Sequence, residues 1–386
     1  MRVKANSQKF LKKYVLDEGL CTDCGACVGL CPYQAIYHDR TVQLHNCDLE
    51  DGKCYAFCPR TATDLAALRK HLFEPDNLTL EIGAVKGYYF SQATDPELRK
   101  IAQHGATVTA LIEVALAEGL IDSAIVSSRN EEFMQNGAII NDRGALRKNA
   151  GSKFTVSPTV AAFNQLVTED RGTIGVVTTP CQALALAKMK LVKEDNPKIG
   201  QLKLVIGLYC GWTLSAEKYT KLLLEKNISP ESITKMDIPA GKNILELFTN
   251  NGVKSIPFDE VQECIRPSCN YCLDSTAEYA DVSVGSACFA GDWEDVRQWN
   301  QLIVRTAKGR ELVDLAVKRG VLEIREAPAE SLKELKDAAE KKKKEALKNI
   351  IKKSGSVKKL LYLDSHDPVV KKYLEVRGKN RTEKKK

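Results

Sequence analysis

The residues of this 386-residue chain with the clearest chemistry are four cysteines near its start. The run CTDCGACVGLCP has the spacing C-x2-C-x2-C-x3-C-P and contains Cys21, Cys24, Cys27 and Cys31. This spacing is typical of a loop that binds a cubane iron–sulfur cluster, with the fourth cysteine directed to a neighbouring cluster. Disulfides are the alternative for 13 cysteines, but secreted disulfide scaffolds are short and begin with a signal peptide. The start, MRVKANSQKFLKKYVL, has no apolar segment of that kind, so we expect a cytoplasmic iron–sulfur protein.

A second group of cysteines, Cys47, Cys54 and Cys58, ends in CYAFCP. A symmetric two-cluster module would have a further cysteine where this chain has Asp51. Since the fourth cysteine of each run binds the other run's cluster, we expect one cluster on Cys21, Cys24, Cys27 and Cys58. A second cluster would use Cys31, Cys47 and Cys54, with Asp51 or a solvent molecule as its fourth ligand. A carboxylate is a harder ligand than a thiolate and would hold iron less firmly. Alternatively, Asp51 only forms the Asp-Gly turn of LEDGKC.

The net charge of +7 comes from the end of the chain. Residues 331–386 contain 19 Lys or Arg against 8 Asp or Glu, which leaves the rest of the chain net negative. We expect a solvated helix face followed by a frayed end, or else a surface that docks onto an acidic partner subunit. No basic stretch with interleaved aromatic residues is present, so binding of nucleic acid is not expected. No apolar stretch approaches the ~20 residues of a transmembrane segment.

Hydrophobic patterning indicates the elements that must hold these ligands. We expect an α+β, ferredoxin-like iron–sulfur module over residues 1–62, then a helix in TATDLAALRKHL and a polar linker around 74–77. From Gly83 onward, short apolar strands alternate with helical segments, for instance GTIGVVTTP before CQALALAKMKLV. This alternation favours an α/β domain with a largely parallel sheet, which we divide into residues 83–165 and 166–328. A charged helix from Ala329 to Lys352 and a basic tail, together residues 329–386, complete the chain.

Four cysteines of the second half lie where they could share one site. Cys181, in TTPCQ, and Cys210, in GLYCGW, follow two predicted strands, and Cys269 and Cys272 form a C-x2-C pair just after Cys264. Ligands of open α/β sheets gather at the carboxyl ends of strands, so these thiolates could close a four-sulfur site. Zinc suits four sulfurs, whereas a third iron–sulfur cluster would continue a chain of redox centres. The alternative is that Cys181 and Cys210 are ordinary buried cysteines.

From about Lys86 to Lys353 the sequence resembles the beta subunits of coenzyme F420-reducing hydrogenases and formate dehydrogenases. The segments that carry the resemblance are QHGATVTALIEVALAEGLID, NAGSKFTVSP, VVTTPCQALALAKMK, IGLYCGW, KMDIPAGK, PSCNYCLDSTAEYADVSVGS and AAEKKKKEALKNI. TTPCQ with the later C-x2-C is specific to this family, whereas a lysine-rich closing helix is not. With its N-terminal module, the layout is similar to the input subunit of the F420H2 dehydrogenase complex.

The resemblance implies a domain that holds FAD and one [4Fe-4S] cluster and passes electron pairs between FAD and the deazaflavin coenzyme F420. By motif, it assigns the cluster to Cys181, Cys210, Cys269 and Cys272. It assigns the FAD site to the turn at Gly105, Ala106 and Thr107 and to the loop of Gly151, Ser152 and Lys153. Residues 83–165 would bind flavin, and residues 166–328 would bind flavin and the cluster. Two or three clusters are expected in the whole chain.

Two features depart from the family pattern. The family commonly has paired glycines where this chain has Gly105-Ala106, and a second glycine would let the backbone approach a phosphate closely. In addition, the stretch EDVRQWNQ is added after Gly291-Asp292-Trp293. This insertion could change the substrate entrance, and it leaves the identity of the hydride donor open. Relatives of the family that do not use a deazaflavin include a chlorophyll-modifying reductase.

Three further residues have alternative roles. Lys153 could pair with flavin N1/O2 or an acidic substrate tail, and it is our candidate catalytic residue, unless it is only a solvated lysine. Arg266, beside the C-x2-C pair, could raise the potential of the cluster or bind the partner. His104 is expected to make a local hydrogen bond rather than act as a ligand or a base.

These residues predict an iron–sulfur flavoprotein oxidoreductase. A hydride carrier delivers two electrons whereas a cluster takes one, so a flavin must stand between them. We expect electrons to pass between a soluble carrier, most readily coenzyme F420, and other redox subunits of hydrogenase, dehydrogenase or reductase type. The alternatives are a non-catalytic electron-transfer or scaffold subunit, a reductase of a specific organic substrate, and a relative that uses NAD(P)H.

Overall fold

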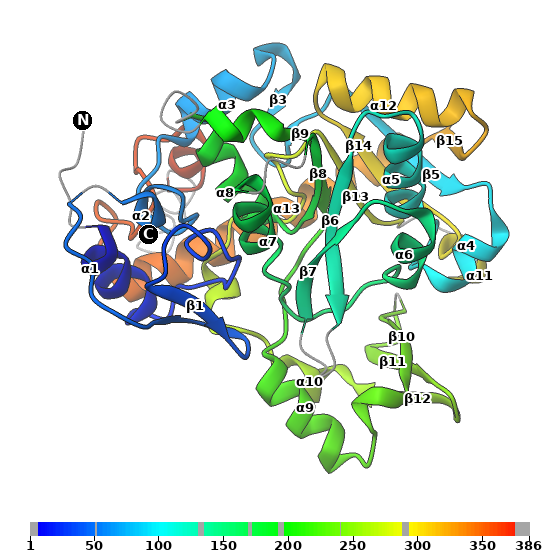
Figure 1. The fold of residues 1–386 in the computed structure, drawn as a ribbon, viewed down its shortest axis with the longest axis horizontal. Coiled ribbons are helices and arrows are strands. Elements are labelled where there is room, and N and C mark those ends of the chain that lie inside the picture. The colour runs from blue at the N-terminus through cyan, green and yellow to red at the C-terminus, as the bar shows by residue number, and fades with distance from the viewer. Residues whose placement is uncertain are drawn as a thin grey trace, which may run out of the picture.

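The computed structural model describes residues 7–50, 52–129, 135–168, 172–191, 197–239, 241–287 and 293–374. An eight-stranded sheet in the order β15-β5-β14-β13-β9-β8-β6-β7 occupies the middle of Figure 1. Its strands are β5 Gly87–Ala93, β6 Ser123–Arg129, β7 Gln135–Ile140, β8 Ile174–Thr178, β9 Leu202–Leu208, β13 Val282–Ser286, β14 Asn300–Val304 and β15 Leu322–Glu326. Strands from residues 83–165 and from residues 166–328 therefore share one sheet.

The sheet is mixed, so the expectation of a largely parallel sheet is wrong. Only the four central strands β13, β9, β8 and β6 run parallel. β7 pairs antiparallel with β6, and β14, β5 and β15 add antiparallel neighbours on the other side. Antiparallel neighbours need no crossover helix between them. The alternation of strands and helices in the sequence therefore identifies the parallel centre and not the strands added at either side.

Helices cover both faces of the sheet. α5 Thr107–Ala117 and α12 Ala307–Lys318 pack on one face, and α7 Thr159–Thr168 and α8 Pro180–Leu191 pack on the other. Strand β9 shows why both faces are covered. Its Leu204 and Ile206 belong to the core that α5 and α12 cover, whereas Leu202 and Val205 belong to the core that α7 and α8 cover. A strand buried on both faces is apolar throughout. The shorter helices of this domain are α4 Pro96–Ile101, α6 Arg143–Lys148, α11 Trp293–Val296 and the 3-10 helix η4 Pro197–Gln201.

The N-terminal module lies at one end of the sheet, at the left of Figure 1. It contains α1 Ser7–Leu11, the π-helical turn η1 Lys12–Leu16, the hairpin β1 Gln34–Tyr37 and β2 Arg40–Gln43, and α2 Lys53–Ala56. The helix expected in TATDLAALRKHL is confirmed as α3 Leu65–Leu72, and the Asp64 side chain caps it by accepting a hydrogen bond from Ala67 N. The 3-10 helix η2 Pro75–Asn77 and the short pair β3 Leu78–Thr79 and β4 Gly83–Ala84 lead to the main sheet.

α13 Ala329–Ser354 confirms the expected charged helix, and Gly355 ends it in the left-handed conformation with φ 65°. The sequence suggested that this helix would be the last ordered element, but ordered and packed residues follow it. Tyr362, Val370 and Tyr373 pack beside Ile350 of the helix in a separate hydrophobic core. The expected solvated face is also interrupted, because Lys343 is buried. Residues 375–386, the expected frayed end, lie outside the described part of the chain.

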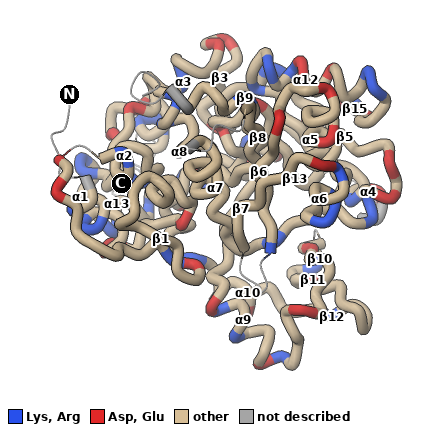
Figure 2. Tube along the Cα trace, viewed as in Figure 1, with Lys and Arg blue, Asp and Glu red and all other residues tan. Residues whose placement is uncertain are grey.

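The chain segment that connects β9 to β13 forms a small lobe, which projects below the main sheet in Figure 1. It consists of the antiparallel strands β10 Ile233–Asp237, β11 Ile244–Thr249 and β12 Gly252–Pro257, with α9 Ala216–Glu225, η5 Pro230–Ser232 and α10 Phe258–Gln262, and it is followed by η6 Pro267–Tyr271. Leu223, Leu247 and Val261 belong to its own core. Figure 2 shows basic and acidic residues interspersed over the described chain. None of the described helices has the length and apolar character needed to cross a bilayer.

Candidate iron–sulfur and cofactor sites

The first thiol set contains Cys21, Cys24, Cys27 and Cys58, the four cysteines expected to share one cluster. Burial, followed by the neighbouring Cys58 and Cys24 thiols, raises the pKa of Cys21 to about 12. Burial and then Cys21, Cys58 and Cys24 also hold the pKa of Cys27 well above its ordinary value. The four thiols are therefore near neighbours in the fold. Binding of a metal cluster requires thiolates, so loading this set would release protons.

The remaining module cysteines differ in burial. Cys54 is buried beside Cys27 and Cys58, whereas Cys31 and Cys47 are partly exposed. Asp51, the expected fourth ligand, lies outside the described residues. A second cluster on Cys31, Cys47 and Cys54 stays a prediction.

α7 of the main domain holds the ligand loop of the module in place. The Asn164 side-chain amide donates to the carbonyl oxygens of Ala26, at 3.2 Å, and Val28, at 2.7 Å. Gly25 has a φ of 84°, and a Cβ atom there would lie 2.6 Å from the backbone nitrogen of Ala161. Only glycine permits this conformation and this close approach. The loop between Cys24 and Cys27 is therefore fixed against the main domain.

The second thiol set contains Cys181, Cys210, Cys269 and Cys272. Cys181 lies in the first turn of α8 after β8, and Cys210 follows the neighbouring parallel strand β9, so both lie at the same edge of the sheet. Cys269 lies in η6 and Cys272 directly after it. Burial raises the pKa of Cys210, the Lys342 amine partly offsets this, and Cys269, Cys181 and Cys272 raise it further. The structure therefore brings together the four cysteines that the sequence proposed as one site.

The two thiol sets are adjacent. Burial and then the thiol of Cys181 raise the pKa of Cys24 to about 12, so a member of each set lies next to the other. No three His, Cys, Asp or Glu side chains of the described residues converge closely enough to hold a single metal ion. Cys264 belongs to neither set, because it is buried in the core of the small lobe.

Arg266 joins the module to the second set. Its guanidinium is buried and forms ion pairs with Asp23 and Asp39, and Nη1 lies 2.8 Å from the Asp39 carboxylate. Both acids belong to the N-terminal module. The expectation that Arg266 could bind a partner protein is therefore wrong, because its guanidinium is buried and already paired with two carboxylates of the same chain.

Sequence reasoning missed two lysines at these sites. Lys188 of α8 donates to the carbonyl oxygen of Cys58 at 2.6 Å, and burial lowers its pKa to about 8 although Cys58 and Cys24 partly offset this. Lys342 of α13 donates to the carbonyl oxygen of Cys210 at 2.6 Å. A lysine within the apolar helix CQALALAKMKLV was a usable signal for Lys188. Nothing in the run of four lysines distinguishes Lys342.

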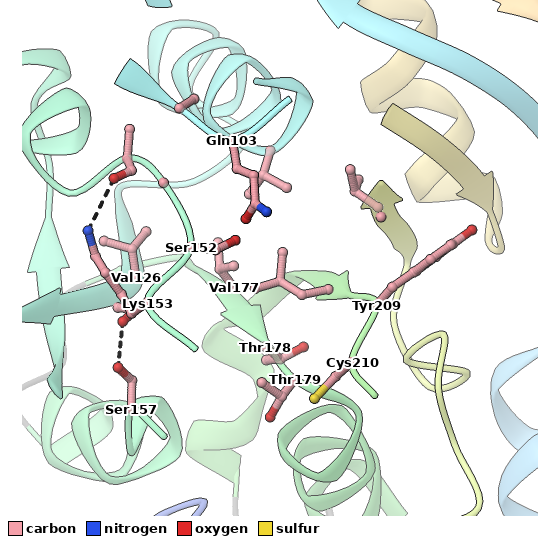
Figure 3. Close-up of a pocket in the computed structure, with 18 of the residues that line it drawn as sticks. Gln103, Val126, Ser152, Lys153, Ser157, Val177, Thr178, Thr179, Tyr209 and Cys210 are labelled. Atoms are coloured by element: carbon pink, nitrogen blue, oxygen red, sulfur yellow. Dashed lines mark hydrogen bonds between the residues drawn. The ribbon is translucent and has the colours of Figure 1, made fainter. Parts of the chain in front are cut away.

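A cavity of about 380 Å³ lies at the carboxyl edge of the central strands. Its lining includes Ala106 and Thr107 of the first expected FAD segment, Gly151, Ser152 and Lys153 of the second, and Cys210 of the second thiol set. Figure 3 shows Lys153 and Ser157 on one side of this cavity, and Thr178 and Thr179 beside Cys210 on the other. The cavity thus reaches from the two segments assigned by resemblance to a thiol of the second set.

Gly105 does not line the cavity but lies behind its wall. A Cβ atom there would lie 2.6 Å from the carbonyl oxygen of Ser91, so the residue must be glycine. Ala106 follows with φ 60° and ψ 16°, a left-handed conformation that strains alanine, directly before the first turn of α5. The backbone therefore adopts here a conformation that glycine would favour, in agreement with the paired glycines of the family pattern.

Lys153 lines the cavity, and neighbouring residues partly bury its side chain. Its amine donates to the carbonyl oxygen of Ala150 at 3.1 Å. Burial and then the positive charge of Arg129 lower its pKa to about 8. The alternative of an ordinary solvated lysine is therefore wrong, and this amine can change protonation state near neutral pH.

His104 forms a hydrogen bond, as the sequence predicted, but its partners lie far away in the sequence rather than nearby. Its Nε2 lies 3.1 Å from Ser286 Oγ and 3.5 Å from the carboxylate of Asp237 in the small lobe. Burial favours a raised pKa for Asp237, but the His104 contact and Arg297 outweigh it and hold the pKa below its ordinary value. Arg297 belongs to the predicted insertion and lies 3.8 Å from Asp237. Gly291 and Asp292 lie outside the described residues.

Comparison with known proteins gives three family matches. Residues 88–164 match the N-terminal model of the coenzyme F420 hydrogenase/dehydrogenase beta subunit, and residues 172–330 match its C-terminal model. Residues 14–37 match a 4Fe-4S binding domain. The first thiol set thus lies partly in this last match, because Cys58 is outside it.

Curated relatives and a solved structure agree with these matches. The coenzyme F420 hydrogenase subunit beta of Methanothermobacter thermautotrophicus is 31% identical over 70% of this chain and 95% of its own length. A subunit of the F(420)H(2) dehydrogenase of Methanosarcina mazei is 26% identical over 86% of this chain and 91% of its own length. The coenzyme F420-dependent sulfite reductase of Methanocaldococcus jannaschii is 28% identical over 80% of this chain, which spans 48% of that protein. A chain of the F420-reducing [NiFe] hydrogenase complex from Methanosarcina barkeri has the same fold, with a TM-score of 0.64 and 24% identity over 72% of this chain and 94% of that one.

Proposed function

Because this chain belongs to the family of coenzyme F420 hydrogenase/dehydrogenase beta subunits, we propose that it is an iron–sulfur flavoprotein that transfers electrons between coenzyme F420 and a partner redox protein. The relatives support an oxidoreductase subunit, and the N-terminal match to a 4Fe-4S binding domain adds an iron–sulfur module to it. The proposal extends this to FAD in the cavity and to clusters at both thiol sets. It also includes a cytoplasmic location among other redox subunits.

One observation carries the proposal: Cys210 lines the cavity while Cys181 of the same set adjoins Cys24 of the module. These contacts support a path for electrons from the cavity to the second thiol set. From there the path continues to the first thiol set, which contains Cys21, Cys24, Cys27 and Cys58. Cys31 and Cys47 of the module would then follow in this path, toward a partner protein. The order of the redox centres is therefore part of the proposal.

The cavity has properties that suit a flavin. Its volume lies within the usual range of ligand sites. A flavin bound there would take two electrons from a hydride carrier and release them singly. Apolar side chains such as Ile112, Val126 and Val177 would exclude water from it. The N-terminus of α5 provides backbone N–H groups for a phosphate, although Thr107 N already donates to Asn300 Oδ1 at 3.2 Å. The Lys153 amine would face an acidic group of the flavin or of the substrate.

The test uses the full chain, purified without oxygen. Iron, acid-labile sulfide and flavin are measured per chain for the native protein and for Cys269→Ala and Cys264→Ala. Cys269 belongs to the second thiol set, whereas Cys264 is a buried cysteine only five residues away. We expect Cys269→Ala to lose one cluster and its EPR signal and Cys264→Ala to keep every cluster. Equal iron content in the two variants would contradict a cluster at the second set.

Activity distinguishes the alternatives. Oxidation of reduced coenzyme F420 with an artificial one-electron acceptor is compared with oxidation of NADH under the same conditions. Preference for the deazaflavin supports the proposal, and preference for NADH would replace it by the NAD(P)H-using alternative. Native protein without flavin and without either activity would instead indicate a non-catalytic electron-transfer or scaffold subunit.

A further inference from the structure

Arg60 is a buried cation that no carboxylate of the described chain neutralises. It follows Cys58 and Pro59 and is 4% exposed. Its Nη1 donates to the carbonyl oxygen of Tyr271 at 2.8 Å and to the hydroxyl of Tyr362, and its Nη2 donates to the carbonyl oxygen of Ser268 at 3.0 Å. Its Nε is buried without a hydrogen-bond partner among the described residues. The hydrogen bonds that hold this guanidinium are therefore with uncharged oxygens.

Two other buried arginines have acidic partners. Arg69 of α3 pairs with Asp367, and Arg266 pairs with Asp23 and Asp39. Burial of an unpaired charge is unfavourable unless another negative group compensates for it. Arg305 is also buried and, like Arg60, donates its hydrogen bonds to uncharged oxygens, among them those of Ile82 and Thr276. The surroundings of Arg60, rather than the lack of an ion pair, therefore indicate what its charge serves.

The surroundings of Arg60 include thiols of the second set. The guanidinium and the thiols of Cys181 and Cys272 line the same small cavity, of about 60 Å³. The cavity is also lined by Asp274 and by two carboxylates that other cations neutralise, Asp367 paired with Arg69 and Glu278 paired with Lys343. Burial alone would lower the pKa of Arg60, but Tyr362 and then Cys272, Cys181 and Cys269 raise it above its ordinary value. The backbone N–H of Arg60 also donates to the sulfur of Cys58 at 3.4 Å. Arg60 thus adjoins Cys58 of the first set, while its guanidinium lies at the cavity that Cys181 and Cys272 of the second set line.

We propose that Arg60 is the counter-charge of a cluster bound by Cys181, Cys210, Cys269 and Cys272, and that it raises the reduction potential of that cluster. The inference rests on the proposed function, since it assumes a cluster at the second set. A thiolate-bound cluster is negatively charged and gains one more negative charge when it accepts an electron, so a fixed cation stabilises the reduced state more than the oxidised one. The electron would come from a flavin in the cavity and pass on to the module, while arginine keeps its proton throughout. Arg60 acts through the cluster and does not touch the substrate.

The experiment is a potentiometric titration of the full chain, purified without oxygen and followed by EPR. Arg60→Gln removes the charge and keeps a polar side chain, whereas Arg60→Lys keeps the charge without the planar fork. The double variant Arg69→Gln/Asp367→Asn is the matched control, because this buried pair lines the same cavity and its removal leaves the net charge there unchanged. We expect the midpoint potential of the second-set cluster to shift to more negative values in Arg60→Gln and to stay near the native value in Arg60→Lys and in the double variant.

An unchanged midpoint in fully loaded Arg60→Gln would overturn the inference, and so would an equal shift in Arg69→Gln/Asp367→Asn. If Arg60→Gln does not retain iron, it has no midpoint potential to measure, and Arg60→Lys tests the role of Arg60 instead. A role of the charge predicts that Arg60→Lys restores both the iron content and a midpoint near the native one. A role of the hydrogen bonds alone predicts that Arg60→Lys is as depleted as Arg60→Gln, because lysine cannot reach Tyr271, Tyr362 and Ser268 in the same way.

Failure of this inference is distinguishable from failure of the proposed function. If native protein lacks the EPR signal that depends on Cys269, no cluster is present at the second set and the proposed function itself is wrong. If the signal is present and its midpoint does not respond to Arg60→Gln, only the role of Arg60 is wrong.

Discussion

The guanidinium of Arg266 lies 2.8 Å from the carboxylate of Asp39, across the boundary between the main domain and the N-terminal module. A second ion pair joins Arg266 to Asp23, the residue directly before Cys24. These contacts fix the module relative to the second thiol set. Electron transfer between two clusters requires such a fixed relation, so the ion pairs support the route that we propose.

Replacement of Arg266 by leucine is expected to destabilise the protein strongly. Asp23 and Asp39 would remain buried without their cation, and loss of one partner of a buried pair costs about 3–5 kcal/mol. The measurement is the free energy of unfolding from urea titrations. Arg40→Ala is the control, because the exposed Arg40–Glu217 pair also joins the module to another part of the chain, α9 of the small lobe. An exposed pair contributes about 1 kcal/mol or less, so similar losses in the two variants would contradict the prediction.

Lys343 is expected to be the one sensitive position in the run of four lysines. It is buried and paired with Glu278, and burial raises the pKa of that carboxyl while Lys343 partly offsets the effect. Lys343→Met should lower the free energy of unfolding by about 3 kcal/mol, since it leaves Glu278 buried without its cation. Lys341→Met is the matched control at an exposed position of the same helix. A loss in Lys341→Met as large as that in Lys343→Met would show that the buried pair is not the cause.

Ala106→Gly is expected to stabilise the protein. The left-handed conformation at φ 60° costs alanine about 1–2 kcal/mol, and the greater freedom of glycine in the unfolded chain offsets about 0.4–1 kcal/mol of the gain. The free energy of unfolding should therefore rise by roughly 0.5–1 kcal/mol. The same substitution in the middle of α5, Ala110→Gly, should lower it by about 1 kcal/mol. If Ala106→Gly is also destabilising, the strain at Ala106 is not as described.

Lys153 should make stability depend on pH in the alkaline range. Burial and then Arg129 lower its pKa from 10.5 to about 8 in the folded protein. Between these two values the unfolded chain binds a proton that the folded chain has released, so the free energy of unfolding rises with pH. The unfavourable contribution is complete below pH 8 and is relieved as pH approaches 10.5.

The corresponding measurement compares Lys153→Met with the native protein by urea titration from about pH 7 to about pH 10.5, the range that spans the two pKa values. The stability of the methionine variant relative to the native protein should be most favourable at the neutral end and should decline as pH rises. Lys153→Arg stays charged over this range and should not show the alkaline rise of the native protein. A constant difference between the native and methionine proteins would contradict the lowered pKa.

The sequence alone determined the features that depend on local spacing. The C-x2-C-x2-C-x3-C-P run, the helix in TATDLAALRKHL and the strand–helix order around Cys181 and Cys210 are each encoded by neighbouring residues. Cluster-binding loops and buried strands have such local patterns, so the first thiol set and the carboxyl-edge location of Cys181 and Cys210 could be inferred before any coordinates.

Only the tertiary structure decided which distant residues meet. The antiparallel strands around the parallel centre, the pairing of Arg266 with the module, and the burial of Arg60, Lys188 and Lys343 have no local signature. From the sequence, a lysine or arginine is expected to be exposed to solvent, and only the tertiary structure shows where other chain segments bury it. The charges around the thiol sets come from α8, η6, α13 and the module together, and their proximity results from packing between elements far apart in the sequence.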